Sequence, residues 1–465
     1  MIKQVTLSLL AAGVLSACSL APTYERPAAP VADAFPVQTA AGNASATGWR
    51  DFFPDQRLQL LIDAALANNR DLRIAALRVE EARALYNIQS AELLPALNAT
   101  ASGTRTRTPA NLSLSGRTAV GSSYQVGLGL TAFELDFFGR VRSLNEASLA
   151  QYLASEEAAR ALRITLVAEV AKAYLAEQAF DEQYELARKT FESREAAYRL
   201  AKQRFEVGAS SALDLRQNET LVQTARAALA ALTRQRAQAS NVLTLLVGAP
   251  LKDLPAAQRL SAQNLVTDIP AGLPSDLLER RPDIRAAEQR LRAANANIGA
   301  ARAAFFPRIA LTASTGTASN ALSGLFESGS RTWSFVPQLA LPIFDAGRNS
   351  ANLDLAQVRN NVAIADYEKT IQVAFREVSD ALVARSALEE QIDAQRAVLE
   401  AQAERFKLVD QRYRAGVSSS LELLDAEREL FSAQQTLVQA RLLRLTNAVD
   451  LYRALGGGLN EGAVK

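Results

Sequence analysis

The chain has 465 residues, with 51 basic and 49 acidic side chains and no histidine. This balanced charge gives no reason to expect a nucleic-acid partner. With one cysteine, one methionine and no histidine, the chain lacks the residues that build Ser-His-Asp and Cys-His nucleophile systems and most transition-metal sites. The composition therefore predicts neither an enzyme nor a metal centre.

The N-terminus has the form of a secretory signal. Lys3 supplies a positive start, an apolar run covers Val5–Leu15, and small residues lead up to Cys18. This segment resembles a bacterial lipobox, which implies removal of residues 1–17 and a covalent lipid on Cys18; we expect no other cofactor. Ser19 then implies sorting to the outer membrane. An ordinary signal peptide with an incidental cysteine is the alternative.

The rest of the chain contains an internal duplication. Residues 18–57 are interpreted as a lipid-anchored N-terminal strap, in which the stretch Ala21–Gly48 is rich in alanine and proline and has no core of its own. Farther along, the motif Asp71-Leu72-Arg73 recurs as Asp283-Ile284-Arg285. We expect a first repeat over residues 58–247, a connection over 248–274, a second repeat over 275–455 and a tail over 456–465.

Each repeat is predicted to contain a helix, two strands, a long helix and, after a turn, a last helix. The long helices follow Gly139 and Gly347 and cover residues 140–207 and 348–415, which contain neither glycine nor proline. Each would be roughly 100 Å long at about 1.5 Å per residue. The other helices are expected over Leu58–Ala91, Ser210–Val247, Ser275–Ala304 and Ser418–Leu455.

The predicted strands, within residues 96–135 and 308–343, alternate apolar and polar side chains. Such alternation over about ten residues is typical of a transmembrane strand, although a half-buried soluble hairpin has the same local pattern. The lipid signal favours the membrane. The expected apolar faces contain Leu97, Ala99 and Ala101; Tyr124, Val126, Leu128, Leu130 and Ala132; Ile309, Leu311 and Ala313; and Trp333, Phe335, Leu339 and Leu341.

Four strands cannot close a membrane sheet alone. In lipid every backbone polar group must be paired within the protein, which for strands requires a closed barrel. Such barrels have at least about eight strands. We therefore expect an obligate oligomer, with eight strands from two chains or twelve from three.

Short motifs are spread along almost the whole chain. They include Trp49-Arg50-Asp51-Phe52-Phe53, Glu134-Leu135-Asp136-Phe137-Phe138-Gly139-Arg140, Arg280-Arg281-Pro282-Asp283, Ala303-Ala304-Phe305-Phe306-Pro307, Tyr413-Arg414-Ala415-Gly416-Val417 and Ala454-Leu455-Gly456-Gly457-Gly458. In these motifs the chain resembles the outer-membrane efflux channel family, the TolC/OprM-like outer membrane factors, and most closely its lipid-anchored OprM-like branch. The resemblance implies a mainly α fold with a membrane β-barrel. As a homotrimer, the duplicated helix-strand-strand-helix-helix repeats would form a 12-stranded outer-membrane barrel continued by a 12-helix periplasmic tunnel.

The resemblance also implies a function and partners. Such channels passively export drugs or other small solutes, delivered by an inner-membrane RND-type transporter through a periplasmic adaptor protein, and they contact outer-membrane lipid. The channel of a one-step protein secretion system is an alternative. A non-channel coiled-coil lipoprotein scaffold is a second alternative, against which the four alternating strands argue.

The turns after the long helices are the expected adaptor-contacting tips. Gly208 and Gly416, flanked by Val207 and Val417, would lie at the periplasmic end of the tunnel. A purely structural role for each glycine, in a turn that needs a positive φ, is the alternative.

The resemblance places a gate beside these tips. Asp425 matches the aspartate that rings the closed aperture, with Glu422 on the same helical face; a local ion pair with Arg428 is the alternative, and both can hold together. Tyr413 and Asp214 match a hydrogen-bonded pair that holds neighbouring hairpins closed. Some family members add an arginine latch, and this chain has Ser418 in its place.

Overall fold

The computed structural model describes residues 19–37, 48–114, 116–251, 254–263, 265, 271–272 and 274–457. The predicted lipidation site Cys18 and the signal peptide lie outside these residues. The described chain is mainly helical, with one four-stranded antiparallel sheet, as the fold class predicted. The oligomeric barrel stays a prediction.

The chain divides into two compact units, and each of the two long helices, α5 (Arg140–Glu206) and α9 (Arg348–Arg414), contributes to both. We call them the sheet unit and the hairpin unit. The sheet unit contains the chain up to Ala28, Arg78–Glu156 and Ala286–Glu368; the hairpin unit contains Ala29–Leu77, Glu157–Arg285 and the chain from Lys369 on.

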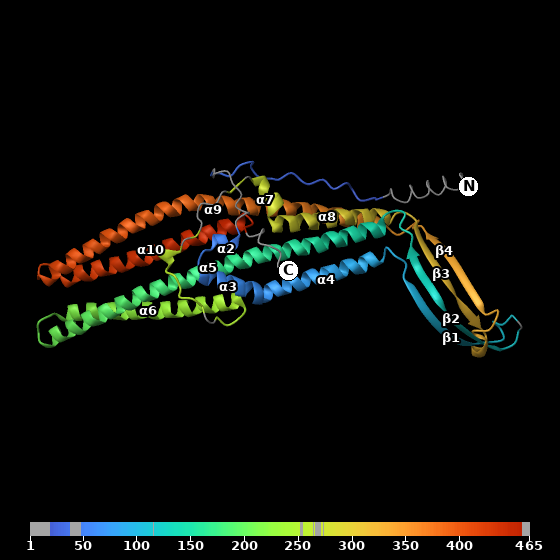
Figure 1. The fold of residues 1–465 in the computed structure, drawn as a ribbon, viewed down its shortest axis with the longest axis horizontal. Coiled ribbons are helices and arrows are strands. Elements are labelled where there is room, and N and C mark those ends of the chain that lie inside the picture. Colours follow the sequence, from blue (N-terminus) through green and yellow to red (C-terminus); the bar gives the residue numbers. More distant parts are fainter. Residues whose placement is uncertain are drawn as a thin grey trace. The chain divides into compact units, whose positions relative to one another are not determined.

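The four strands of the sheet unit lie in sequence order (Figure 1). They are β1 (Leu97–Thr108), β2 (Ala119–Glu134), β3 (Arg308–Ser319) and β4 (Arg331–Ala340). All neighbours are antiparallel, and β2 pairs with β3, which joins the two repeats in one sheet. Within the described chain, the outer edges of β1 and β4 therefore have no strand beside them.

The register gives the sheet one apolar and one polar face, because residues directly opposite each other share a face. Leu130, for example, lies opposite Leu97 of β1 and Ala313 of β3, and Ala313 lies opposite Phe335 of β4. The polar face includes Asn98, Thr100, Gln125, Thr312, Ser314, Ser334 and Gln338.

One predicted position on the apolar face is wrong. The β2–β3 register shifts between Leu130 and Phe133, so that β2 contains one extra residue there. Ala132 lies in this β-bulge with a φ of +48°, and Phe133 takes the place that strict alternation gave to Ala132. A bulge breaks the two-residue period locally. Residues 130–133 contain no glycine, so the sequence gives no local sign of the bulge.

The N-terminal segment of the sheet unit lies extended along α8 (Pro282–Ala303). The Tyr24 hydroxyl donates to Glu288 at 3.2 Å, and the Arg26 guanidinium donates to both Glu288 oxygens at 3.2 and 3.0 Å. The next turns of α8 hold the backbone carbonyls of this segment: Asn295 donates to Pro22, and Arg302 donates to Leu20.

The hairpin unit contains two antiparallel helical hairpins, with α6 beside α5 and α10 beside α9 (Figure 1). Its core contains the fully buried Phe52 and the Tyr452 ring, which stack at a centroid distance of 4.2 Å. No helix in the described ranges combines the length and apolar composition of a membrane span. The helices not yet given are α2 (Trp49–Phe52), α3 (Gln56–Asn68), α4 (Arg70–Ala91), α6 (Ala212–Val247), α7 (Pro274–Arg280), α10 (Ser420–Ala454) and two short 3-10 helices, Leu260–Ala262 and Leu322–Gly324.

The single helices predicted over Leu58–Ala91 and Ser275–Ala304 are wrong, because each is interrupted. The first breaks at Asn69, which has an extended ψ of 132° and accepts the backbone N–H of Leu72 at 2.9 Å, as an N-cap does. The second breaks at Arg281, because Pro282 starts α8 and a proline disfavours a helical residue before it.

Both interruptions hold the end of a hairpin helix. The Asn69 amide donates to the carbonyl of Leu246 at 2.8 Å, and the Arg281 guanidinium donates to the carbonyl of Ala454 at 2.9 Å. These carbonyls are in the last turns of α6 and α10, where backbone acceptors lack partners within the helix. The two repeats therefore fasten equivalent helix ends with different side chains.

The Arg281 contact is part of a buried ionic network. Its side chain, only 6% exposed, also pairs with Asp283 and with Glu377 at 2.9 Å, and Glu377 in turn pairs with Arg453 at 3.0 Å. Removing one partner from a buried charge network leaves the others without compensation. The Arg281 side chain therefore connects α7, α8, α9 and α10 at one point.

Arg281→Gln should lower the thermal midpoint of unfolding, because the Ala454 carbonyl and Glu377 lose the guanidinium donor, which costs about 1–3 kcal/mol. Circular dichroism at increasing temperature measures the midpoint. The neighbouring variant Arg280→Gln is the control, since the side chain of Arg280 is 35% exposed. Equal midpoints for the two variants would contradict the assigned role of Arg281.

Candidate functional site

The two turns at the tips of the hairpins have the same structure. Gly208 and Gly416 have φ values of +75° and +74°, which glycine adopts without the strain that other residues incur. After the first, the N–H of Ala209 donates to the carbonyl of Arg204 at 2.7 Å; after the second, Val417 donates to Arg412 at 2.9 Å. This is a Schellman termination of each long helix. The structural role foreseen for both glycines is therefore present.

A serine then starts each return helix. Ser211 accepts the backbone N–H of Asp214 at 3.1 Å, and Ser419 accepts that of Glu422 at 3.3 Å. Ser/Thr followed three residues later by an acidic side chain is a helix-start pattern. Asp214 and Glu422 are thus equivalent positions of the two repeats, each in the first turn of a helix. Val207 and Val417 beside the glycines are exposed.

Two hydrogen bonds connect the tips of the two hairpins. The Ser420 hydroxyl donates to Asp214 at 3.1 Å, and the Arg204 guanidinium donates to the Tyr413 hydroxyl at 3.4 Å. Tyr413 and Asp214, expected to pair between neighbouring hairpins, each have another partner within the chain. Hydrogen bonds from Ser211 and Ser420 lower the pKa of Asp214 below its ordinary value of 3.8, so Asp214 remains an ionised acceptor at neutral pH.

Asp425 lies between two arginines. The Arg405 guanidinium of α9 donates to one carboxylate oxygen at 2.7 Å, and Arg428 of α10 pairs with the other. The local ion pair with Arg428 is therefore present. A ring of Asp425 side chains from several copies stays a prediction. In such a ring, each Asp425 carboxylate would remain paired with Arg405 and Arg428 of its own chain.

A deeper ion pair joins the hairpins a few turns from the tips. Arg194 of α5 and Glu427 of α10 approach to 3.9 Å, with side chains that are 6% and 17% exposed. Burial raises the pKa of Glu427 above its ordinary value of 4.5, and burial lowers the pKa of Arg194. Desolvation therefore outweighs attraction in this pair, although Arg194 also donates to the carbonyl of Leu221 at 3.5 Å.

The sequence did not predict Arg405, Ser420, Arg194 or Glu427 as members of this site. Each acts on a residue of another helix, so no local spacing pointed to the contact. Only the pairing of the hairpins brings these side chains together.

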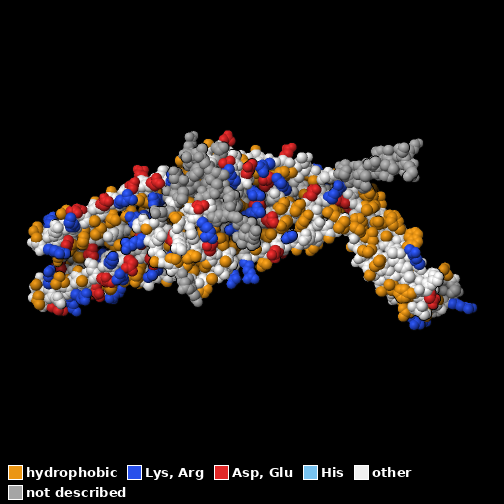
Figure 2. All heavy atoms as spheres, in the orientation of Figure 1, with side chains coloured by type: hydrophobic (Ala, Val, Ile, Leu, Met, Phe, Trp, Pro, Cys, Tyr) orange, Lys and Arg blue, Asp and Glu red, His pale blue; other side chains and the backbone are white. Residues whose placement is uncertain are grey.

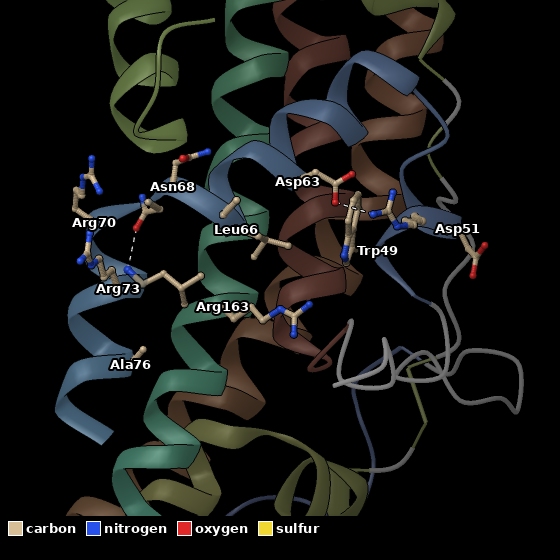
Figure 3. Close-up of a pocket in the computed structure, with 13 residues that line it drawn as sticks. Trp49, Asp51, Asp63, Leu66, Asn68, Arg70, Arg73, Ala76 and Arg163 are labelled. Carbon is tan, nitrogen blue, oxygen red and sulfur yellow. Dashed lines mark hydrogen bonds and ion pairs between the residues drawn. The ribbon is translucent and has the colours of Figure 1, made fainter. Parts of the chain in front are cut away.

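A separate hollow of about 1030 Å³ lies in the hairpin unit beside the break between α3 and α4 (Figure 3). Arg50 stacks over the Trp49 ring at 4.4 Å and pairs with Asp63 at 2.6 Å. Within the described ranges, no group of three or more potential metal ligands is present. Other residues lining the hollow include Leu66, Asn68, Asn69, Arg70, Arg73, Ala76 and Arg163.

Known proteins share this architecture over almost its whole length. The chain is 52% identical to outer membrane protein OprJ of Pseudomonas aeruginosa, over 98% of this chain and 96% of that protein. It is 49% identical to the probable efflux pump outer membrane protein TtgC of Pseudomonas putida, over 99% and 97%. The solved open state of the Neisseria gonorrhoeae MtrE outer membrane channel is 46% identical, with a TM-score of 0.87 over 95% of this chain and 99% of that one.

The fold and the paired hairpins thus define a TolC-like outer membrane channel. The sequence model of the outer membrane efflux protein family matches residues 61–249 and 273–457, and the chain belongs to that family. The resemblance seen in the sequence motifs and the outer-membrane localisation are confirmed.

The raised pKa of Glu427 predicts a pH effect. A raised folded-state pKa means that protonation favours the folded chain, so this stability is present below 4.5 and is lost as the pH rises through the raised value. Glu427→Gln removes the titration. The thermal midpoint of the parent minus that of the variant should therefore increase as the pH falls from about 7 to about 4.

Glu429→Gln serves as the control for this measurement, since Glu429 is exposed and pairs with the neighbouring Arg428. A difference between parent and Glu427→Gln that stays constant or shrinks on acidification would show that Glu427 does not titrate in this way.

Proposed function

We propose that this protein is the outer-membrane channel of a tripartite efflux pump. It would passively conduct drugs or other small solutes that an inner-membrane RND-type transporter delivers through a periplasmic adaptor. The observation that carries the proposal is the near full-length similarity to proteins named efflux pump outer membrane proteins. Conduction needs no reacting groups, and we infer that the protein is not an enzyme.

The sheet supports an oligomer. Its apolar face suits lipid, but the backbone of its two edge strands needs partners that lipid cannot supply. Three copies would provide twelve strands, with each β4 edge beside the β1 edge of the next copy, and twelve hairpin helices. We propose this homotrimer, with Cys18 lipidated as a further attachment to the membrane.

The tips support a gate. Two hydrogen bonds, Ser420–Asp214 and Arg204–Tyr413, connect the hairpins there, each with one charged partner, and a bond of this kind contributes only about 1.5 kcal/mol. An adaptor that binds the turns at Gly208 and Gly416 could offset so small a free energy. We propose that adaptor binding opens the tunnel by separating the hairpin tips.

Deleting the gene should raise the intracellular accumulation of drugs or solvents that the parent strain exports. A plasmid copy should restore export, and the purified protein should form pores in planar bilayers. A strain that retains the plasmid but lacks the transporter is the control. Full export without this protein, or a purified oligomer that forms no pores, would contradict the proposed function.

Tyr413→Phe combined with Asp214→Ala should raise the single-channel open probability at least about tenfold, because the closed tips lose both hydrogen bonds between the hairpins, worth together more than about 1.4 kcal/mol. Planar-bilayer recording measures it. Asp410→Ala is the matched control, since Asp410 pairs with Arg414 on its own helix. An unchanged open probability in the double variant would show that these two residues do not hold the gate closed.

A further inference from the structure

The sheet carries a charge excess that the rest of the chain balances. Residues 97–134 and 308–340, which form the four strands and their loops, contain five arginines, no lysine and two carboxylates, Glu134 and Glu327, whereas the whole chain has 51 basic and 49 acidic side chains. Arg308, at the helix end of the sheet, pairs with Glu134. The four others are Arg105, Arg107, Arg117 and Arg331.

Three of these four arginines lie on the apolar face of the sheet. Arg105 and Arg107 continue the β1 positions of Ala99 and Ala101 toward the loop, since every second residue of a strand shares a face. Arg331 lies opposite Thr317 of β3, which lies opposite Val126 on that same face. The apolar face therefore becomes basic toward the loops, and basic side chains are visible at the loop end of the sheet in Figure 2.

Arg117, the fourth, is in the loop between β1 and β2. All four side chains are exposed, and no carboxylate pairs with them among the described residues. Unpaired arginines beside an apolar surface suit a ligand that offers anionic groups next to hydrocarbon. The planar guanidinium binds phosphate oxygens in a bidentate manner.

We propose that these arginines bind the phosphate groups of a phosphorylated glycolipid in the outer leaflet, while the apolar face below them contacts its acyl chains. The proposal rests on the proposed function, an outer-membrane channel, and takes the loops between the paired strands to lie on the outer side of the membrane. A soluble acidic protein would match the arginines but not the adjoining apolar face. A zwitterionic lipid would match the apolar face but not the unbalanced charge.

The test compares lipid binding by the purified oligomer and by Arg105→Gln/Arg107→Gln/Arg331→Gln. Native mass spectrometry measures the retention of diphosphoryl lipid A, dephosphorylated lipid A and phosphatidylglycerol. The triple variant should bind diphosphoryl lipid A at least about tenfold more weakly, because each arginine near an anionic lipid surface contributes substantially to binding. Dephosphorylated lipid A should bind the parent and the variant alike.

The matched control is the triple variant Arg216→Gln/Arg376→Gln/Arg396→Gln. It removes three exposed arginines on helices and changes the net charge by the same amount as the sheet variant. Equal lipid A binding by the parent and the sheet variant, an equal loss in the control, or phosphatidylglycerol binding as strong as that of lipid A would overturn the proposal. If the sheet variant does not assemble, the binding of lipid A by the parent is measured at increasing ionic strength instead. The proposal requires this binding to weaken as the ionic strength rises, and unchanged binding would overturn it. Pore formation by the same parent sample tests the proposed function separately.

Discussion

The unpaired edges of β1 and β4 are the constraint on which the rest of the account depends. A sheet that is apolar on one face can face lipid, but its edge amides and carbonyls cannot remain without partners there. Four strands are too few for one chain to close the sheet on itself. The duplication that places β2 beside β3 therefore supplies only part of a barrel. The two free edges, of β1 and β4, indicate where other copies of the chain must attach.

The hairpin unit shows how polar contacts of different strength divide one body into fixed and movable parts. At one end of α6 and α10, buried side chains hold the last carbonyls, and Arg281 does so within a network of several charges. At the other end, Ser420–Asp214 and Arg204–Tyr413 are the hydrogen bonds that connect the exposed tips within the part of the chain that the structure describes. A force applied at the turns would separate the tips long before it disturbed the buried ends, and that is the physical basis of the proposed gate.

The sequence predicted features that depend on local periodicity. Runs without glycine or proline contain the long helices, two-residue alternation marks the sheet faces, and Gly208 and Gly416 mark the turns. It did not predict features that depend on tertiary contact. At the breaks, Asn69 and Arg281 bind carbonyls that are 177 and 173 residues away in the sequence, and the bulge at Ala132 is visible only in the β2–β3 register.

The same limit applies to the site. Asp214, Tyr413 and Asp425 were identified through their resemblance to family motifs, which carry no information on partners within this chain. Arg405, which neutralises Asp425 from the opposite helix, and Ser420, which donates to Asp214, emerge only when the hairpins pack. Sequence reasoning therefore found the acceptors of the tip network but missed most of its donors.

Disulfide cross-linking between the sheet edges tests the central claim most directly. Thr100→Cys on the polar face of β1 is combined in turn with Ser334→Cys, Val336→Cys or Gln338→Cys on that face of β4, and the oxidised oligomer is separated under denaturing conditions. The account predicts that one combination links neighbouring copies into a covalent trimer. An intact oligomer in which no combination links β1 to β4 of another copy would contradict it.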